Sequence, residues 1–116
     1  MNWAALVPVL LLAASNVVMN VAWYGHLKVP HLALWLAVLA AWGIALFEYS
    51  LAVPANRIGA ATYSLAELKT IQEVLSLATF VVVAWVLFDQ RPGPSQIAGF
   101  ALIAGGAWLV FKAPFG

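Results

Sequence analysis

Apolar residues fill four long stretches of this chain, and short segments rich in glycine and proline separate them. A helix that crosses about 30 Å of hydrocarbon needs about 20 predominantly apolar residues. The pattern therefore predicts an all-α protein with four transmembrane helices, over residues 3–24, 32–53, 65–88 and 95–111. The short connections force neighbouring helices to run antiparallel, and breaker residues mark each one: Gly25 and Pro30, Pro54 and Gly59, and Pro92, Gly93 and Pro94.

The third and fourth helices carry further local signals. Ser64 followed three residues later by Glu67 is a capping-box pattern, so we expect Glu67 to cap a helix rather than to take part in chemistry. The fourth helix has only 15 uninterrupted apolar residues, 97–111, which rise about 22 Å. Its small residues include Ala101 and Gly105, a spacing that permits close helix approach. We expect this helix to be packed at a subunit interface.

Composition supports an integral membrane protein. Of the 116 residues, 66% are hydrophobic and 8% are charged, and the mean hydropathy is +1.00, so we expect residues 1–116 to form a single transmembrane domain. The first apolar run lacks the basic start and the cleavage site of a secretory signal, so we expect it to remain in the protein as a transmembrane helix. The net charge of +1 is dispersed and predicts no nucleic-acid partner, and the absence of Cys excludes disulfides and thiolate chemistry.

The basic residues are divided almost evenly between the two sides of the membrane. Arg57, Lys69 and Lys112 fall on the side of the termini, and Lys28 and Arg91 fall on the other. This weak bias favours cytoplasmic termini and is also compatible with insertion both ways and antiparallel dimers. We expect the protein in the inner (plasma) membrane, in contact with lipid.

Two carboxylates, Glu48 and Glu73, lie inside predicted spans. An acidic residue at mid-bilayer costs roughly 2.5 to 3.5 kcal/mol, so each needs a partner, a proton or water. Glu73 is the deeper of the two, and we favour a function for it. For Glu48 three interpretations remain open: a function, a side chain that snorkels to the interface, or an ion pair with Arg57. We also expect the two glutamates to lie near one another across the hairpin of the second and third helices.

Other polar residues gather around these glutamates. Lys69, Gln72, Glu73, Ser76 and Thr79 fall within an arc of about 120° of the third helix, and Lys69 is spaced to pair with Glu73. Asn16 and Asn20, with Ser15, are open between bonding to another helix and lining a cavity. The candidate proton-binding or substrate-binding residues are Glu73, Glu48, Gln72, Lys69, Ser76, Asn16, Asn20 and Tyr49. We expect no catalytic residue, no cofactor and no metal, since His26 and His31 are too few for a metal site.

Several motifs resemble a known group of transporters. The segments 63–110, 88–92 and 97–106, the last with its closing glycines, look like the second hairpin of the drug/metabolite transporter superfamily. A chain of 116 residues with four spans resembles the small multidrug resistance transporters. The segments 22–28, 42–45, 47–49, 53–59 and 68–73 are closer still to an uncharacterised four-span bacterial family of that superfamily.

The resemblance implies a dimer, often antiparallel, with a midplane cavity lined by the first three helices and with the fourth helix pairing across subunits. The chain departs from small multidrug exporters in one respect. Their binding glutamate lies in the first span, where this sequence has Ser15, Asn16 and Asn20. The glutamates here would have to act from the second and third helices.

The leading hypothesis is a secondary transporter that works by alternating access and moves a small cationic or amphipathic solute, with intramembrane glutamates that bind the solute or a coupled proton. The alternative is a non-transporting membrane subunit or lipid-interacting protein whose glutamates serve helix assembly. We do not expect an enzyme, because no nucleophile and base pair, metal set or phosphate loop is present in the sequence.

Overall fold

The computed structural model describes residues 2–116 and consists of helices without strands in that range. Four α-helices, α1 (Trp3–Tyr24), α2 (Leu34–Gly59), α3 (Leu65–Phe88) and α4 (Pro94–Lys112), follow one another, and a short 3-10 helix, η1 (Gly25–Lys28), extends α1. All four are long and apolar enough to cross a membrane. The expected four-helix, all-α membrane fold is confirmed.

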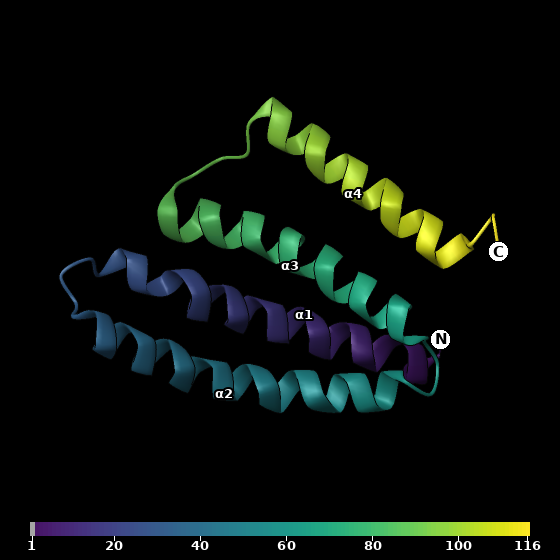
Figure 1. Ribbon diagram of the computed structural model, residues 1–116, viewed down its shortest axis with the longest axis horizontal. Coiled ribbons are helices and arrows are strands. Elements are labelled where there is room, and N and C mark those ends of the chain that lie inside the picture. Colours follow the sequence, from purple (N-terminus) through teal and green to yellow (C-terminus); the bar gives the residue numbers. More distant parts are fainter. Residues whose placement is uncertain (1) are drawn as a thin grey trace.

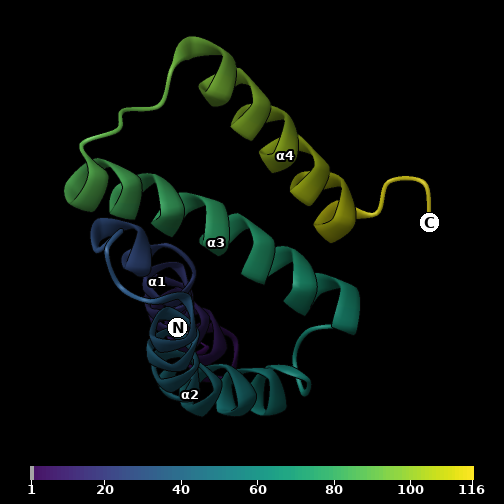
Figure 2. The same ribbon diagram turned by 60° about the vertical axis from the view of Figure 1, so that its left-hand side comes forward.

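The helices lie side by side in the order α2, α1, α3, α4 (Figure 1), and the turned view in Figure 2 keeps this order. The helix α1 packs against both α2 and α3, and it contributes more buried residues than any other helix: Pro8, Leu12, Ser15, Asn16, Asn20 and Ala22. By contrast, α4 contacts α3 along one side and buries no residue of its own. The core of the described chain is therefore centred on α1.

The second helix is longer than predicted, and the expected loop at Pro54 is wrong. Pro54 lies inside α2, which runs on to Gly59 instead of ending at residue 53. Tertiary packing explains the difference, because Ala55 is fully buried and Gly59 lies against its neighbours. A Cβ atom at Gly59 would lie 2.7 Å from the side chain of Leu68 on α3 and 3.2 Å from that of Pro8 on α1. Proline is tolerated inside membrane helices when the surrounding structure holds the chain in place.

Side chains of the α2–α3 connection tie it to the start of α1. The proline ring of Pro8 cannot donate to the carbonyl four residues earlier, that of Ala4. The hydroxyl of Thr62 donates to this carbonyl at 3.4 Å, and the hydroxyl of Tyr63 donates to the carbonyl of Ala5 at 2.8 Å. The bond from Thr62 gives the Ala4 oxygen a donor in place of the missing proline N–H, and the bond from Tyr63 adds a second link between the connection and α1.

Local signals define the ends of α3. The capping box expected from Ser64 and Glu67 is confirmed, since each side chain bonds the backbone N–H of the other, at 3.1 and 2.9 Å. At the other end, Asp89 takes a left-handed conformation with φ of 53°, and the N–H of Gln90 donates to the carbonyl of Ala84 at 3.0 Å. This bond from beyond the helix end to a carbonyl of the last turn is typical of helix C-caps.

Candidate functional site

Glu48 is the most enclosed charged side chain in the described part of the protein. It projects from α2 toward α1 and is only 3% exposed. Its Oε1 atom accepts a hydrogen bond of 2.7 Å from the hydroxyl of Ser15 on α1, which is 1% exposed. The side chain is therefore held between the two helices rather than directed toward the membrane surface, and neither snorkelling nor a pair with Arg57 is observed among residues 2–116.

The second oxygen of Glu48 has no such partner. Oε2 is buried and lacks a hydrogen bond to any residue from 2 to 116. Buried polar atoms are nearly always hydrogen-bonded, and an exception in a folded protein calls for a ligand, a proton or a functional cause. One oxygen of this carboxylate is thus held by Ser15, and the other meets no hydrogen-bond donor among residues 2–116.

Small residues on α2 make this burial possible. Ala52, Ala55 and Gly59 are buried on the same helix and continue the face of Glu48 at intervals of three to four residues, and the buried Ala37 lies on this face about three turns before Glu48. Small side chains allow two helix backbones to approach closely in a membrane. Glu48 is the large polar residue on an otherwise small and apolar face, so the approach of α1 encloses it.

Asn20 links α1 to α3. Its side-chain amide donates to the hydroxyl of Thr79 at 2.8 Å and to the carbonyl of Ser76 at 3.2 Å. Asn16, one turn earlier and 3% exposed, donates to the carbonyl of Leu12 in its own helix at 2.8 Å. The buried polar residues of α1 therefore bond in two directions, through Ser15 to α2 and through Asn20 to α3.

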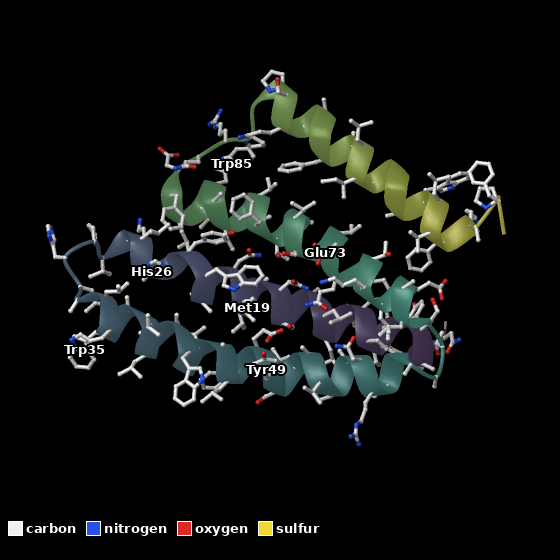
Figure 3. The ribbon with its side chains drawn as sticks, viewed as in Figure 1. Met19, His26, Trp35, Tyr49, Glu73 and Trp85 are labelled. Atoms are coloured by element: carbon white, nitrogen blue, oxygen red, sulfur yellow. The ribbon has the colours of Figure 1, made fainter. Side chains whose placement is uncertain are left out.

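Glu73 lies in a different environment. It forms the expected ion pair with Lys69, at 2.8 Å, but the side chains of Lys69 and Glu73 are 68% and 56% exposed in the single chain. Figure 3 shows Glu73 on α3 and Tyr49 on α2, on opposite sides of α1, which carries Met19. Glu48 bonds to Ser15 and Glu73 to Lys69, so the expected meeting of the two glutamates across one hairpin is not what the contacts show.

The other candidate residues also fall into a more buried and a more exposed group. Gln72 and Ser76 are half-buried, whereas Tyr49 is 60% exposed. The stripe of α3 is therefore split, since its later residues Ser76 and Thr79 bond to α1 and its earlier residues Lys69 and Glu73 face outward. Ser15, which forms the hydrogen bond to Glu48, is not among the candidate residues predicted from the sequence. Its spacing from Pro8, Leu12 and Ala22 on one buried face is the signal that indicates its direction.

No group of three His, Cys, Asp or Glu side chains among residues 2–116 is placed to hold a metal ion. The fold and the site together define a multi-pass membrane protein with a buried carboxylate between two of its spans. Such intramembrane carboxylates are frequent in substrate and proton pathways.

A family model described as "Putative member of DMT superfamily (DUF486)" matches residues 8–111, which include all but the first residues of α1 and the last of α4. The chain therefore belongs to this family, within the drug/metabolite transporter superfamily, whose members are transporters and not enzymes. Neither the curated proteins nor the solved structures give a significant match.

Proposed function

We propose that the protein is a small secondary transporter of the inner membrane that works by alternating access and binds a proton or a small cationic or amphipathic solute at Glu48. The observation that carries this proposal is a carboxylate that is 3% exposed, has one oxygen bonded to Ser15 and has the other without a partner among residues 2–116. A carboxylate that served only to join two helices would be expected to use both oxygens. Family membership supports transport, and the geometry supports α2 as the carrier of the binding group.

The proposed functional unit is a homodimer, in which antiparallel subunits are one arrangement. Lys69 and Glu73 are charged side chains exposed well inside a predicted span, and Gly105 and Gly106 on α4 have no atom within 4 Å of an added Cβ. Charged side chains inside a membrane normally face a protein interior or a water-filled cavity. A second subunit that pairs through α4 and covers this face of α3 would enclose the pair of Lys69 and Glu73 and would pack against the uncovered glycines of α4.

A transport assay with the protein reconstituted into vesicles tests the proposal. Vesicles that contain the protein are given a pH gradient and a panel of cationic, zwitterionic and lipid-like solutes, and solute-evoked current is recorded. Glu48→Gln, which keeps the side-chain shape and removes the charge, should abolish a pH-dependent current while the protein remains folded. Glu67→Gln is the matched control, because glutamine also completes a capping box and Glu67 lies in the first turn of α3, away from Glu48.

Comparison with Glu73→Gln identifies the coupling carboxylate. A current that survives Glu48→Gln and is lost in a folded Glu73→Gln would refute the role of Glu48 and favour the exposed face of α3. If folded wild type carries no current with the panel and Glu48→Gln changes only stability, the result would favour a membrane subunit in which Glu48 joins α1 to α2.

A further inference from the structure

A continuous groove runs between α3 and α4. It consists of two hollows of about 110 and 170 Å³, which share Val81 on α3 and Phe100 on α4. The groove exists because α4 lies along α3 without burying any residue. Figures 1 and 2 both show α4 as the outermost helix, next to α3 alone.

One end of the groove is polar and carries a positive charge. Gln90, Arg91 and Gln96 line it where α3 ends and α4 begins. The guanidinium of Arg91 lies 5.2 Å from the ring centre of Trp85, and tryptophan is typical of membrane interfaces. Gln96 uses its Oε1 atom to accept from the N–H of Gly93, at 2.9 Å, and this leaves its amide hydrogens free to donate. The neighbouring Asp89 is not among the residues that line the hollow.

The rest of the groove is apolar, and the whole groove is about as long as one leaflet is thick. Beyond Phe100 it is lined by Val74, Leu77, Ala78, Ile103 and Ala104. From Ala84 at the polar end to Val74 at the apolar end, α3 rises about 15 Å, which is half of the hydrocarbon thickness of about 30 Å. We propose that this groove binds a phospholipid, with its phosphate at Arg91 and the two glutamines and one acyl chain between α3 and α4.

Charge and polarity distinguish this occupant from a second copy of the chain. A phosphate matches a guanidinium and two amide donors at the interface, and an acyl chain matches the apolar part of a groove that runs the length of one leaflet. The proposal is independent of transport, since it uses neither Glu48 nor Ser15. Its failure would leave the role of Glu48 untouched.

Native mass spectrometry of the detergent-purified protein tests the proposal with three probes. Dioleoyl phosphatidylglycerol has both the phosphate and the chains, dioleoylglycerol has only the chains, and glycerol phosphate has only the phosphate. Phosphatidylglycerol should bind most tightly, and Arg91→Gln should weaken its binding about fivefold while leaving dioleoylglycerol unaffected. Arg57→Gln is the matched control, because Arg57 is an exposed cation at the end of α2.

A second pair of variants probes the apolar end. Ala104→Phe fills the groove and should weaken phosphatidylglycerol binding, whereas Ala98→Phe, on a part of α4 that does not line the groove, should not. Equal binding of phosphatidylglycerol and dioleoylglycerol, or unchanged binding in Arg91→Gln, would overturn the proposal. It would also be overturned if glycerol phosphate bound as tightly as the lipid, or if Ala104→Phe lowered the dimer fraction without affecting lipid binding, because a second copy would then be the occupant.

Discussion

Replacing Ser15 with alanine and Glu48 with glutamine, singly and together, measures the interaction that holds the carboxylate between α1 and α2. The two side chains form a hydrogen bond of 2.7 Å in a site where both are at least 97% buried, since Glu48 is 3% exposed and Ser15 is 1% exposed. A hydrogen bond to a charged group contributes about 1.5 to 3 kcal/mol, and one between neutral groups contributes about 0.5 to 1.5 kcal/mol. Within membranes the measured values are lower, on average about 0.6 kcal/mol and at most about 1.7 kcal/mol.

From these ranges, Ser15→Ala should lower the free energy of unfolding by about 1.5 kcal/mol when Glu48 is present and by about 0.5 kcal/mol in the Glu48→Gln background. The expected coupling energy is the difference, about 1 kcal/mol, which corresponds to a fivefold change in the unfolding equilibrium. Unfolding in mixed micelles with increasing SDS, followed by tryptophan fluorescence, measures all four proteins under one condition.

Ser50→Ala is the control for this cycle. The Ser50 hydroxyl donates to the carbonyl of Leu46 in its own helix at 2.9 Å, and the residue is exposed. Its loss should add to that of Glu48→Gln without coupling. If Ser15→Ala and Glu48→Gln were additive within about 0.3 kcal/mol, the charge of Glu48 would not strengthen the hydrogen bond. If Ser15→Ala also cost less than about 0.3 kcal/mol in both backgrounds, the hydrogen bond would not contribute to stability and the positioning of Glu48 by Ser15 would be refuted.

Three further substitutions test the packing around α1. Gly59→Ala places a Cβ 2.7 Å from the side chain of Leu68 and should lower stability by about 1 to 3 kcal/mol in the same assay; Gly43→Ala, where nothing lies within 4 Å, should not. Asn20→Leu removes two hydrogen bonds to α3 and should cost about 1 to 2 kcal/mol, and an unchanged midpoint would contradict this. Tyr63→Phe removes a bond of 2.8 Å to the α1 backbone and should cost about 1 kcal/mol, and destabilisation below about 0.3 kcal/mol would show that solvent replaces it.

The helices could be predicted from the sequence because their signals are local. The bounds of α1 and α3 follow from the length of the apolar runs and, for α3, from the capping box at Ser64. Pro54 shows where local signals fail. Its ring disfavours a helix at the preceding residue, but the burial of Ala55 and Gly59 against other helices outweighs this preference. That burial depends on the tertiary arrangement, which the proline signal does not contain.

Glu48 and Asn20 could also be predicted as site residues, but their partners Ser15 and Thr79 could not. Sequence periodicity places Glu48 on one face of α2 and Asn20 on one face of α1, without indicating the rotation and offset of one helix relative to another. The contacts Glu48 to Ser15 and Asn20 to Thr79 depend on that rotation and offset. The ion pair of Lys69 and Glu73 could be predicted because both residues lie on one helix, four positions apart.

The two intramembrane glutamates differ in how their charge is stabilised within the hydrocarbon. Glu73 has a cationic partner, Lys69, but is not enclosed by other residues, since both side chains of the pair are more than half exposed in the single chain. Glu48 has full cover and no cationic partner among residues 2–116, and only one of its oxygens is bonded. A second subunit would cover Glu73, whereas a proton, a bound cation or a buried water would give the second oxygen of Glu48 a partner. These two environments match the roles given to the glutamates in the proposed transporter, in which Glu48 on α2 takes up and releases the ligand and the pair on α3 faces a cavity completed by a second subunit.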